Sequence, residues 1–176
     1  TADVDGDGVD DLVAITAEES RVYWSSGVRG GGFAGIAWAD LPVVPTRVDV
    51  ADVDGNSRPD VLAADDAGTL HVYLWDSLFG PGKAAKSVLS ALSLRLSSLV
   101  TDARVCDVTG DSRKDYLFCD SAGGRVHVLA GPTFSSDQSY AAGTEPSALT
   151  TGDFNADGAQ DLAAANAGGA SVSVFW

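Results

Sequence analysis

Four copies of a nine-residue acidic segment recur along the 176 residues of this chain. They begin at Asp3, Asp52, Asp107 and Asp153, so that successive copies start 49, 55 and 46 residues apart. In every copy an oxygen-bearing side chain stands at positions 1, 3, 5 and 9. Repeats of about 20–50 residues are typical of propellers, solenoids and arrays, so the chain is predicted to consist of repeated small units.

The spacing of these oxygens predicts loops that bind calcium. Ca²⁺ takes six to eight oxygen ligands at about 2.3–2.6 Å, and alternate residues of a curled backbone aim their oxygens at one point. Position 7 normally contributes its backbone carbonyl, so its side chain is free to vary. The sequence therefore predicts up to four Ca²⁺ ions. The expected ligands are Asp3, Asp5, Asp7, Val9 and Asp11; Asp52, Asp54, Asn56, Arg58 and Asp60; Asp107, Thr109, Asp111, Arg113 and Asp115; and Asp153, Asn155, Asp157, Ala159 and Asp161.

The four loops differ in their predicted affinity for the ion. The first has four carboxylates and two glycines, whereas the second and fourth replace one carboxylate by an amide. The third has the hydroxyl of Thr109, with Arg113 and Lys114 close by. We expect the first loop to bind best, then the second and fourth, then the third. A single loop of this composition also suits a solvated turn, but four copies in register are poorly explained by chance.

The residues between the loops follow one order in each copy. An apolar run comes first, at residues 12–15, 61–64, 116–119 and 162–165. After a small polar turn comes a segment of alternating character, at residues 21–24, 70–75, 125–129 and 171–176. Alternation with period 2 after such a turn predicts a β-hairpin. A short strand is also expected before the later loops, at residues 46–50, 103–106 and 147–150.

The remaining segments are expected to hold a fourth strand or a loop, around residues 35–38, 88–96 and 133–140. Residues 83–96 also suit a helix, because they are rich in alanine, leucine and lysine. Four strands per repeat predict a blade of a β-propeller. The predicted fold is all-β, one partial propeller domain over residues 1–176, with repeats at about 1–45, 46–100, 101–146 and 147–176.

Counting strands gives an incomplete first blade, two whole blades and an incomplete last blade. We therefore expect the chain to be a processed or partial piece of a larger propeller, completed by further blades or by a neighbouring chain. A four-bladed ring closed by its two partial blades is the alternative. The sequence contains no methionine, which agrees with the expectation that it is a piece of a longer protein.

The acidic loop followed by an apolar strand resembles the FG-GAP or VCBS repeat, the calcium-loop blade found in integrin α-subunit propellers and in secreted microbial and algal proteins. The resemblance extends to all four copies. It implies that the loop joins the first and second strands of a blade and that the metal braces this connection. The Phe-Gly and Gly-Ala-Pro signatures of the integrin version are missing, so an integrin-like ligand site is not implied.

The charge of the chain excludes some partners. With 25 acidic and 11 basic residues the formal net charge is −14, which disfavours nucleic acid and anionic membrane surfaces. Thirteen of the acidic residues stand at the expected ligand positions, and four Ca²⁺ ions would bring the charge to −6. No apolar run approaches the roughly 18 residues of a membrane span. We expect a secreted protein, extracellular or at the cell surface, whose signal peptide has been removed.

Cys106 immediately precedes the third loop and Cys119 ends the strand after it. In a secreted chain, two cysteines on paired strands favour a disulfide, and this is the prediction. The alternative is that both are buried thiols that pack as small apolar groups.

Histidine and tryptophan occur at repeated strand positions. His71 and His127 are expected to pack rather than to catalyse or bind metal, because no nucleophile motif accompanies them. Three of the tryptophans, Trp24, Trp75 and Trp176, end the alternating segment, which favours packing between blades over stacking against sugars. Trp38 is the fourth.

Three classes of function are compatible with these features of the sequence. The preferred one is a non-catalytic calcium-binding propeller module that binds a protein partner or a neighbouring chain. The alternatives are a lectin that binds carbohydrate and an accessory domain of a secreted enzyme. No phosphate-binding loop, nucleophile elbow or zinc motif is present in the sequence, so it is not expected to be an enzyme.

Overall fold

The structure is a computed structural model of the chain. It describes residues 3, 7–16, 18–28, 31–41, 43–74, 89–95 and 100–176. These residues form strands and one short 3₁₀ helix, so the predicted all-β class is confirmed. By backbone contacts the chain divides into two compact units, residues 1–93 and residues 94–176, each containing two sheets.

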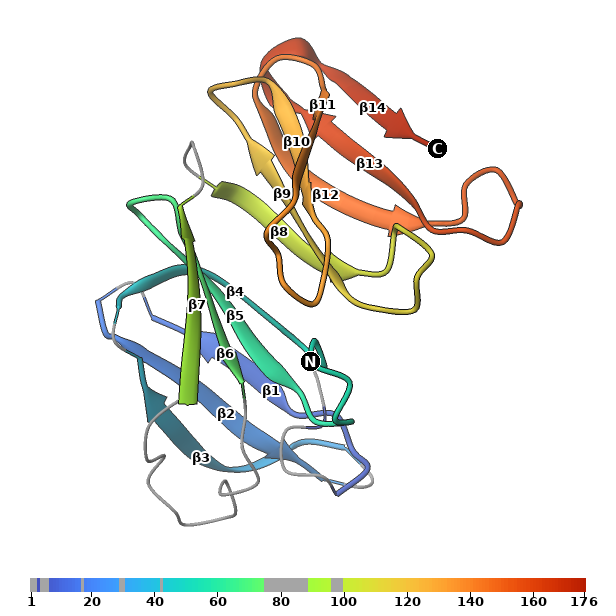
Figure 1. Cartoon of the computed structure of the whole chain (residues 1–176). Coiled ribbons are helices and arrows are strands. Elements are labelled where there is room, and N and C mark those ends of the chain that lie inside the picture. The colour runs from blue at the N-terminus through green and yellow to red at the C-terminus, as the bar shows by residue number, and fades with distance from the viewer. Residues whose placement is uncertain are drawn as a thin grey trace. The chain divides into compact units, whose positions relative to one another are not determined.

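The first unit holds a three-stranded and a four-stranded sheet (Figure 1). In both sheets, strands that follow one another in the chain are neighbours. The first sheet contains β1 (Leu12–Ile15), β2 (Arg21–Gly27) and β3 (Phe33–Asp40); the second contains β4 (Pro45–Ala51), β5 (Asp60–Asp65), β6 (Thr69–Leu74) and β7 (Leu89–Arg95).

The second unit repeats this arrangement with a four-stranded and a three-stranded sheet (Figure 1). The short helix η1 (Ala167–Gly169) forms the turn before the last strand. The third sheet contains β8 (Val100–Cys106), β9 (Asp115–Asp120), β10 (Arg125–Leu129) and β11 (Asp137–Ala141); the fourth contains β12 (Pro146–Gly152), β13 (Asp161–Asn166) and β14 (Ser171–Phe175).

The strands occur where the repeat pattern predicted them. The four apolar runs lie in β1, β5, β9 and β13, and the alternating segments lie in β2, β6, β10 and β14. Residues 89–95 form a strand and not a helix, as the spacing of the repeats predicted. Residues 83–88 and 96 lie outside the described residues. Within the described residues the first and last sheets have three strands each, and the two sheets between them have four.

Alternation along the strands gives each sheet two apolar faces, which we call face A and face B. In the third sheet, face A carries Leu117, Cys119, Val126 and Val128, and it packs against face B of the fourth sheet. Face B of the fourth sheet carries Leu149, Leu162, Ala164 and Phe175. The ring of Tyr140 on face A contacts that of Phe175, with centroids 5.9 Å apart. This contact is the core of the second unit.

The core of the first unit has the same construction. Face A of the first sheet carries Val13, Ile15, Val22 and Trp24, and face B of the second sheet carries Val48, Val61, Ala63 and Tyr73. These two faces form one cluster, joined by Leu41 from the connection that follows β3. Face A of one sheet therefore packs on face B of the next sheet in both units.

The predicted disulfide is wrong, because both cysteines are free. The acidic loop separates the two strands, so the ladder pairs Cys106 with Asp115 at the start of β9. Cys119 stands four residues further along that strand, about 13 Å away at 3.3 Å per residue. A disulfide needs Cα atoms within about 7 Å. The alternative is confirmed for Cys119, which is buried in the core, whereas Cys106 is only partly buried and packs against that core.

The predicted packing of the histidines is confirmed, and that of the tryptophans is confirmed only in part. His71 and His127 are buried and stack on the rings of Tyr73 and Phe118, with centroids 6.0 Å and 4.6 Å apart. Trp24 lies in the core, but Trp176 is exposed, so the packing prediction is wrong for Trp176; Trp38, which lies outside the repeated position, is also exposed. Trp75 lies outside the described residues.

Candidate metal loops

Each acidic loop lies at the same place in its sheet. The second loop joins β4 to β5, the third joins β8 to β9 and the fourth joins β12 to β13. The first precedes β1, and its residues 4–6, which include the predicted ligand Asp5, lie outside the described residues. The connection between the first and second strands of a blade, which the family resemblance implied, is therefore present in the last three copies.

The aspartate at position 1 curls the loop around its own carboxylate. In the third loop, Asp107 accepts hydrogen bonds from the backbone N–H of Gly110 to Oδ1 (2.7 Å) and of Ser112 to Oδ2 (2.8 Å). Asp3, Asp52 and Asp153 accept the equivalent bond to Oδ2 from Gly8, Ser57 and Gly158, at 2.7–2.9 Å. Equal bonds at equal positions show that the described residues of the four loops share one hydrogen-bonding pattern.

Positions 5 and 7 are linked in the same repeated way. The backbone N–H of Arg58 donates to Oδ1 of Asn56 at 2.8 Å, and Val9, Arg113 and Ala159 donate equivalently to Asp7, Asp111 and Asp157 at 2.8–2.9 Å. The hydrogen bond from Ala159, followed by that from the side chain of Asn155, lowers the pKa of Asp157 below its usual value. Position 7 therefore depends on its backbone, and its side chain varies freely.

Positions 4 and 6 require positive φ. Gly55 has a φ of 82° and Ser57 one of 64° in the second loop, and Gly110 and Ser112 have values of 75° and 68° in the third. In the fourth loop Ala156 and Gly158 have values of 62° and 90°. Glycine adopts this left-handed conformation readily, but serine and alanine adopt it too, at a cost of about 1 kcal/mol or more each. The loop geometry thus prevails over residue preference.

The aspartate at position 9 is buried, unlike most of the loop. Asp11, Asp60 and Asp115 are fully buried, and Asp161 is nearly so. Oδ2 of Asp115 accepts the N–H groups of Val108 and Thr109 at 2.9 and 3.0 Å. Val53 and Phe154 donate in the same way to Asp60 and Asp161, at 3.0 and 2.9 Å. Position 9 thus ties the beginning of the loop to its end.

The second oxygen of this aspartate holds a glycine that sequence reasoning missed. Oδ1 of Asp115 accepts the N–H of Gly131 at 3.1 Å, and Oδ1 of Asp11 accepts that of Gly27 at 2.7 Å. A Cβ at Gly131 would collide with the carbonyl oxygen of Lys114, and one at Gly27 would collide with that of Asp10. The available signal was a glycine 16 residues after position 9 in the first and third copies.

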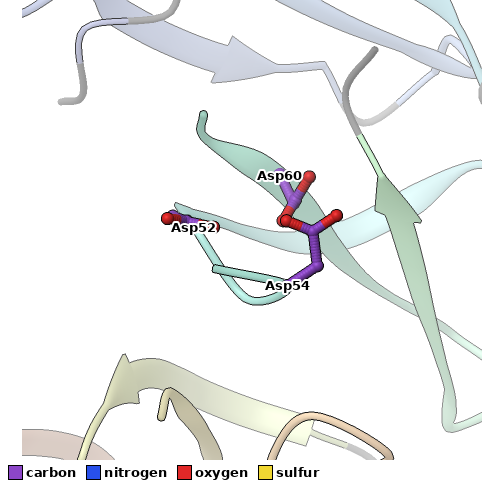
Figure 2. A group of neighbouring side chains, drawn as sticks. All are labelled: Asp52, Asp54 and Asp60. Carbon is purple, nitrogen blue, oxygen red and sulfur yellow. The ribbon is translucent and has the colours of Figure 1, made fainter. Parts of the chain in front are cut away.

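Three carboxylates converge in the second loop. Asp52, Asp54 and Asp60 each offer an oxygen, and these oxygens all lie within 4.8 Å of one another. Figure 2 shows Asp54 on the loop and Asp60 on β5 turned toward each other, with Asp52 at the start of the loop. Two ligands of one Ca²⁺ lie at most about 5 Å apart, so this donor set fits the ion. Without a cation the three charges repel one another.

The other loops do not reach this convergence in the described part of the chain. At position 3 the third loop has Thr109 and the fourth has Asn155. The first loop has Asp5 at this position, which lies outside the described residues. The structure brings no other group of three carboxylate, histidine or cysteine ligands this close within the residues it describes. Convergence is therefore found where a described carboxylate occupies position 3.

The FG-GAP-like repeat family matches the sequence over residues 3–63 and 107–164, which is more than half of the chain. The chain belongs to this family. The two matched segments of this FG-GAP-like protein contain all four acidic loops, the whole of β1 and β9, and the first residues of β5 and β13. No curated protein matches the sequence significantly.

Solved structures with this fold include propeller domains. A crystal structure of BBS1N in complex with ARL6DN, soaked with lead, matches with a TM-score of 0.59 and 17% identity, over 93% of the FG-GAP-like chain and 41% of BBS1N. A second crystal structure of the same complex, soaked with mercury, matches with a TM-score of 0.62 and 14% identity, over 99% of the FG-GAP-like chain and 51% of BBS1N. The FG-GAP-like chain thus spans about half or less of these proteins. No described element is a helix suited to crossing a membrane.

Proposed function

We propose that this chain is a non-catalytic, calcium-stabilised propeller module that binds a protein partner outside the cell. The convergence of Asp52, Asp54 and Asp60 carries the proposal, because three carboxylates within 4.8 Å are stable together when a cation holds them. Asn56 and the backbone carbonyl of Arg58 complete the donor set of this loop. The bound ion supplies the positive charge that fixes the turn between β4 and β5.

The same hydrogen-bond framework in the other loops supports up to four calcium ions. Their position-1 and position-9 aspartates stand at the two ends of each loop, where a metal would join the first strand of a blade to the second. A rigid turn at each blade would hold the sheets in register, and the variable loops would then present a binding surface. The carboxylates are engaged in the loops, which supports a structural rather than a catalytic role.

The extracellular location rests on the affinity expected of such loops. Each loop offers three or four carboxylates from a partly exposed turn, and calcium sites of extracellular modules have Kd values of about 10⁻⁴–10⁻³ M. Such sites would be filled at the calcium concentration outside a cell and empty at the much lower calcium concentration of the cytosol. A protein partner is supported by the BBS1N structures, in which a propeller domain of the same fold is in complex with another protein.

Calorimetric titration of the whole chain with CaCl₂ tests the calcium site. We expect saturable binding that Asp54→Asn weakens at least tenfold in the second loop, because one of the three converging carboxylates is lost. Asp66→Asn removes the same charge from the exposed turn between β5 and β6 and serves as the control. Binding that the two substitutions weaken equally, or no binding at millimolar calcium, would refute the proposal.

Carbohydrate is the second candidate ligand. The ring of Trp38 is about half exposed, and the guanidinium of Arg21 lies 5.7 Å from its centre. Next to it is an open pocket of about 270 Å³ lined by residues 19–21, 40 and 41. A glycan array probed in calcium tests this alternative, with Trp38→Ala and the exposed Trp176→Ala as a matched pair. Loss of glycan binding in Trp38→Ala alone would favour the lectin.

A further inference from the structure

We propose that the Asp54–Gly55 peptide of the second loop is a modification site at which isoaspartate forms, and that Asp52 slows this reaction by binding the N–H of Gly55. An Asp–Gly pair is the pair most open to the reaction, because glycine has no side chain to shield its nitrogen. The proposal concerns hydrogen bonds within the loop. It therefore goes beyond the calcium-binding function and does not require a bound ion.

The Asp–Gly pairs of this chain lie in its acidic loops. The second loop has Asp54–Gly55 at positions 3 and 4, whereas the first and fourth have Asp7–Gly8 and Asp157–Gly158 at positions 5 and 6. All six residues are exposed to solvent, so water reaches each pair. A further pair, Asp5–Gly6, lies outside the described residues. The three described pairs allow one site to be compared with two others in the same molecule.

The reaction joins two groups that are neighbours in the chain. The backbone nitrogen of Gly55 attacks Cγ of the Asp54 carboxyl group, and the new C–N bond closes a five-membered succinimide ring. The N–H proton and the hydroxyl of the carboxyl group leave together as water. A second water then opens the ring. Cleavage at the original peptide carbonyl gives isoaspartate, whereas cleavage at Cγ restores aspartate, so neither an oxidant nor a further reactant is consumed.

Hydrogen bonds direct both reacting groups of the second loop to other partners. The N–H of Gly55 donates to Oδ1 of Asp52 at 2.8 Å. The two carboxylate oxygens of Asp54 accept the backbone N–H and the side-chain amide of Asn56, at 3.0 Å each. Ring closure needs the nitrogen and the carboxyl group to leave these partners and meet. Hydrogen bonds to charged acceptors are among the stronger ones, so the loop as folded disfavours the reaction.

The aspartate at position 1 binds the glycine N–H in the other two pairs as well. Gly8 donates to Oδ2 of Asp3, and Gly158 donates to Oδ2 of Asp153, at 2.9 Å in both loops. Position 1 therefore engages the glycine nitrogen of each Asp–Gly pair that the structure describes, whether the glycine stands at position 4 or at position 6. Each loop thus contains its own protection, which a substitution at position 1 removes from that loop alone.

Modification at Asp54 would alter the loop in which three carboxylates converge. Isoaspartate inserts one further carbon into the backbone between Asp54 and Gly55 and moves the free carboxylate from the side chain to Cα. The oxygens of Asp52, Asp54 and Asp60 lie within 4.8 Å of one another only with the normal backbone. The change would therefore separate position 3 from the other two ligands.

Incubation of the whole chain in water enriched in the heavy oxygen isotope tests the proposal. Each opening of the ring leaves one heavy oxygen atom in the aspartate or isoaspartate, and peptide mass spectrometry reads this label at each site. Fragmentation of the same peptides distinguishes isoaspartate from aspartate. Neutral pH and excess EDTA are used, so that the result does not depend on calcium. A failure here is thereby distinguished from a failure of the proposed calcium site, which titration with calcium tests.

Asp52→Ala is expected to raise labelling and isoaspartate at Asp54 about tenfold over the wild type, because one hydrogen bond to a charged group is lost. Asp7, in the same unit, and Asp157 should keep their wild-type rates, because their own position-1 aspartates are intact. Asp153→Ala should do the reverse, raising the rate at Asp157 alone. An equal rise at Asp54 and Asp7 in Asp52→Ala would overturn the proposal, since unfolding would explain it. An unchanged rate at Asp54 would also overturn it.

Discussion

Gly131 shows how one residue fastens a loop to its sheet. Its N–H reaches Oδ1 of the buried Asp115, while Oδ2 of the same carboxylate holds the beginning of the third loop. The close approach leaves no room for a side chain, because a Cβ would meet the carbonyl of Lys114. Gly27 and Asp11 repeat the arrangement in the first copy. At Gly27 and Gly131 the fold depends on glycine for space rather than for φ.

Gly131→Ala is expected to destabilise the chain by about 2–3 kcal/mol, because it forces backbone atoms apart and breaks the hydrogen bond to a buried charge. Gly110→Ala is the matched control: its φ is 75°, but a Cβ there meets nothing within 4 Å. It should cost only about 1 kcal/mol through backbone strain. Urea unfolding of the two variants measures the difference. Equal losses would contradict the role given to Gly131.

Tyr73 gives the chain a sensitivity to alkali. Burial, with a smaller effect of Asp65, raises the pKa of its hydroxyl to about 12 from an ordinary value of 10. A raised pKa of this kind stabilises the fold below pH 10, and the stability is lost as pH rises from 10 toward 12. In urea unfolding at pH 8 and at pH 11, Tyr73→Phe should lose less stability between the two than the wild type. A decline of the same size in both would contradict this assignment.

At the scale of elements, the loop sequence and the strand sequence act together. The loops fix where each hairpin begins, and alternation fixes which side chains face a neighbouring sheet, so the strands were predictable from the sequence. The disulfide was mispredicted because the loop displaces the register, pairing Cys106 with Asp115 instead of Cys119. Asp115 was predicted only as a ligand, because its link is to Gly131, which follows β10 and lies 16 residues further along the chain.

The ranking of the loops remains a prediction at this scale. Asp52→Ala should lower the melting temperature in calcium more than Asp107→Ala, because the second loop has a carboxylate at position 3 where the third has Thr109. In chelator the two variants should differ less, since both lose the backbone hydrogen bonds from loop positions 4 and 6, and Asp52→Ala loses one more, from Asn56. Calorimetric melting in both media makes the comparison. Equal losses in calcium would undo the ranking.

At the scale of the whole molecule, each unit of the chain buries one face of a small sheet against the next sheet. A series of this kind gains stability from each interface and each turn. Trp176 was expected to pack, but it is exposed.

Calcium in the loops is the central claim, and thermal unfolding of the intact chain with and without the ion tests it most directly. At calcium ten times Kd, each filled site stabilises the folded state by about 1.4 kcal/mol, which raises the melting temperature of a chain this size by roughly 3–6 °C per site. We therefore expect a large fall when excess EDTA replaces millimolar calcium, and recovery when calcium is restored. Melting curves that coincide in calcium and in EDTA would contradict the account.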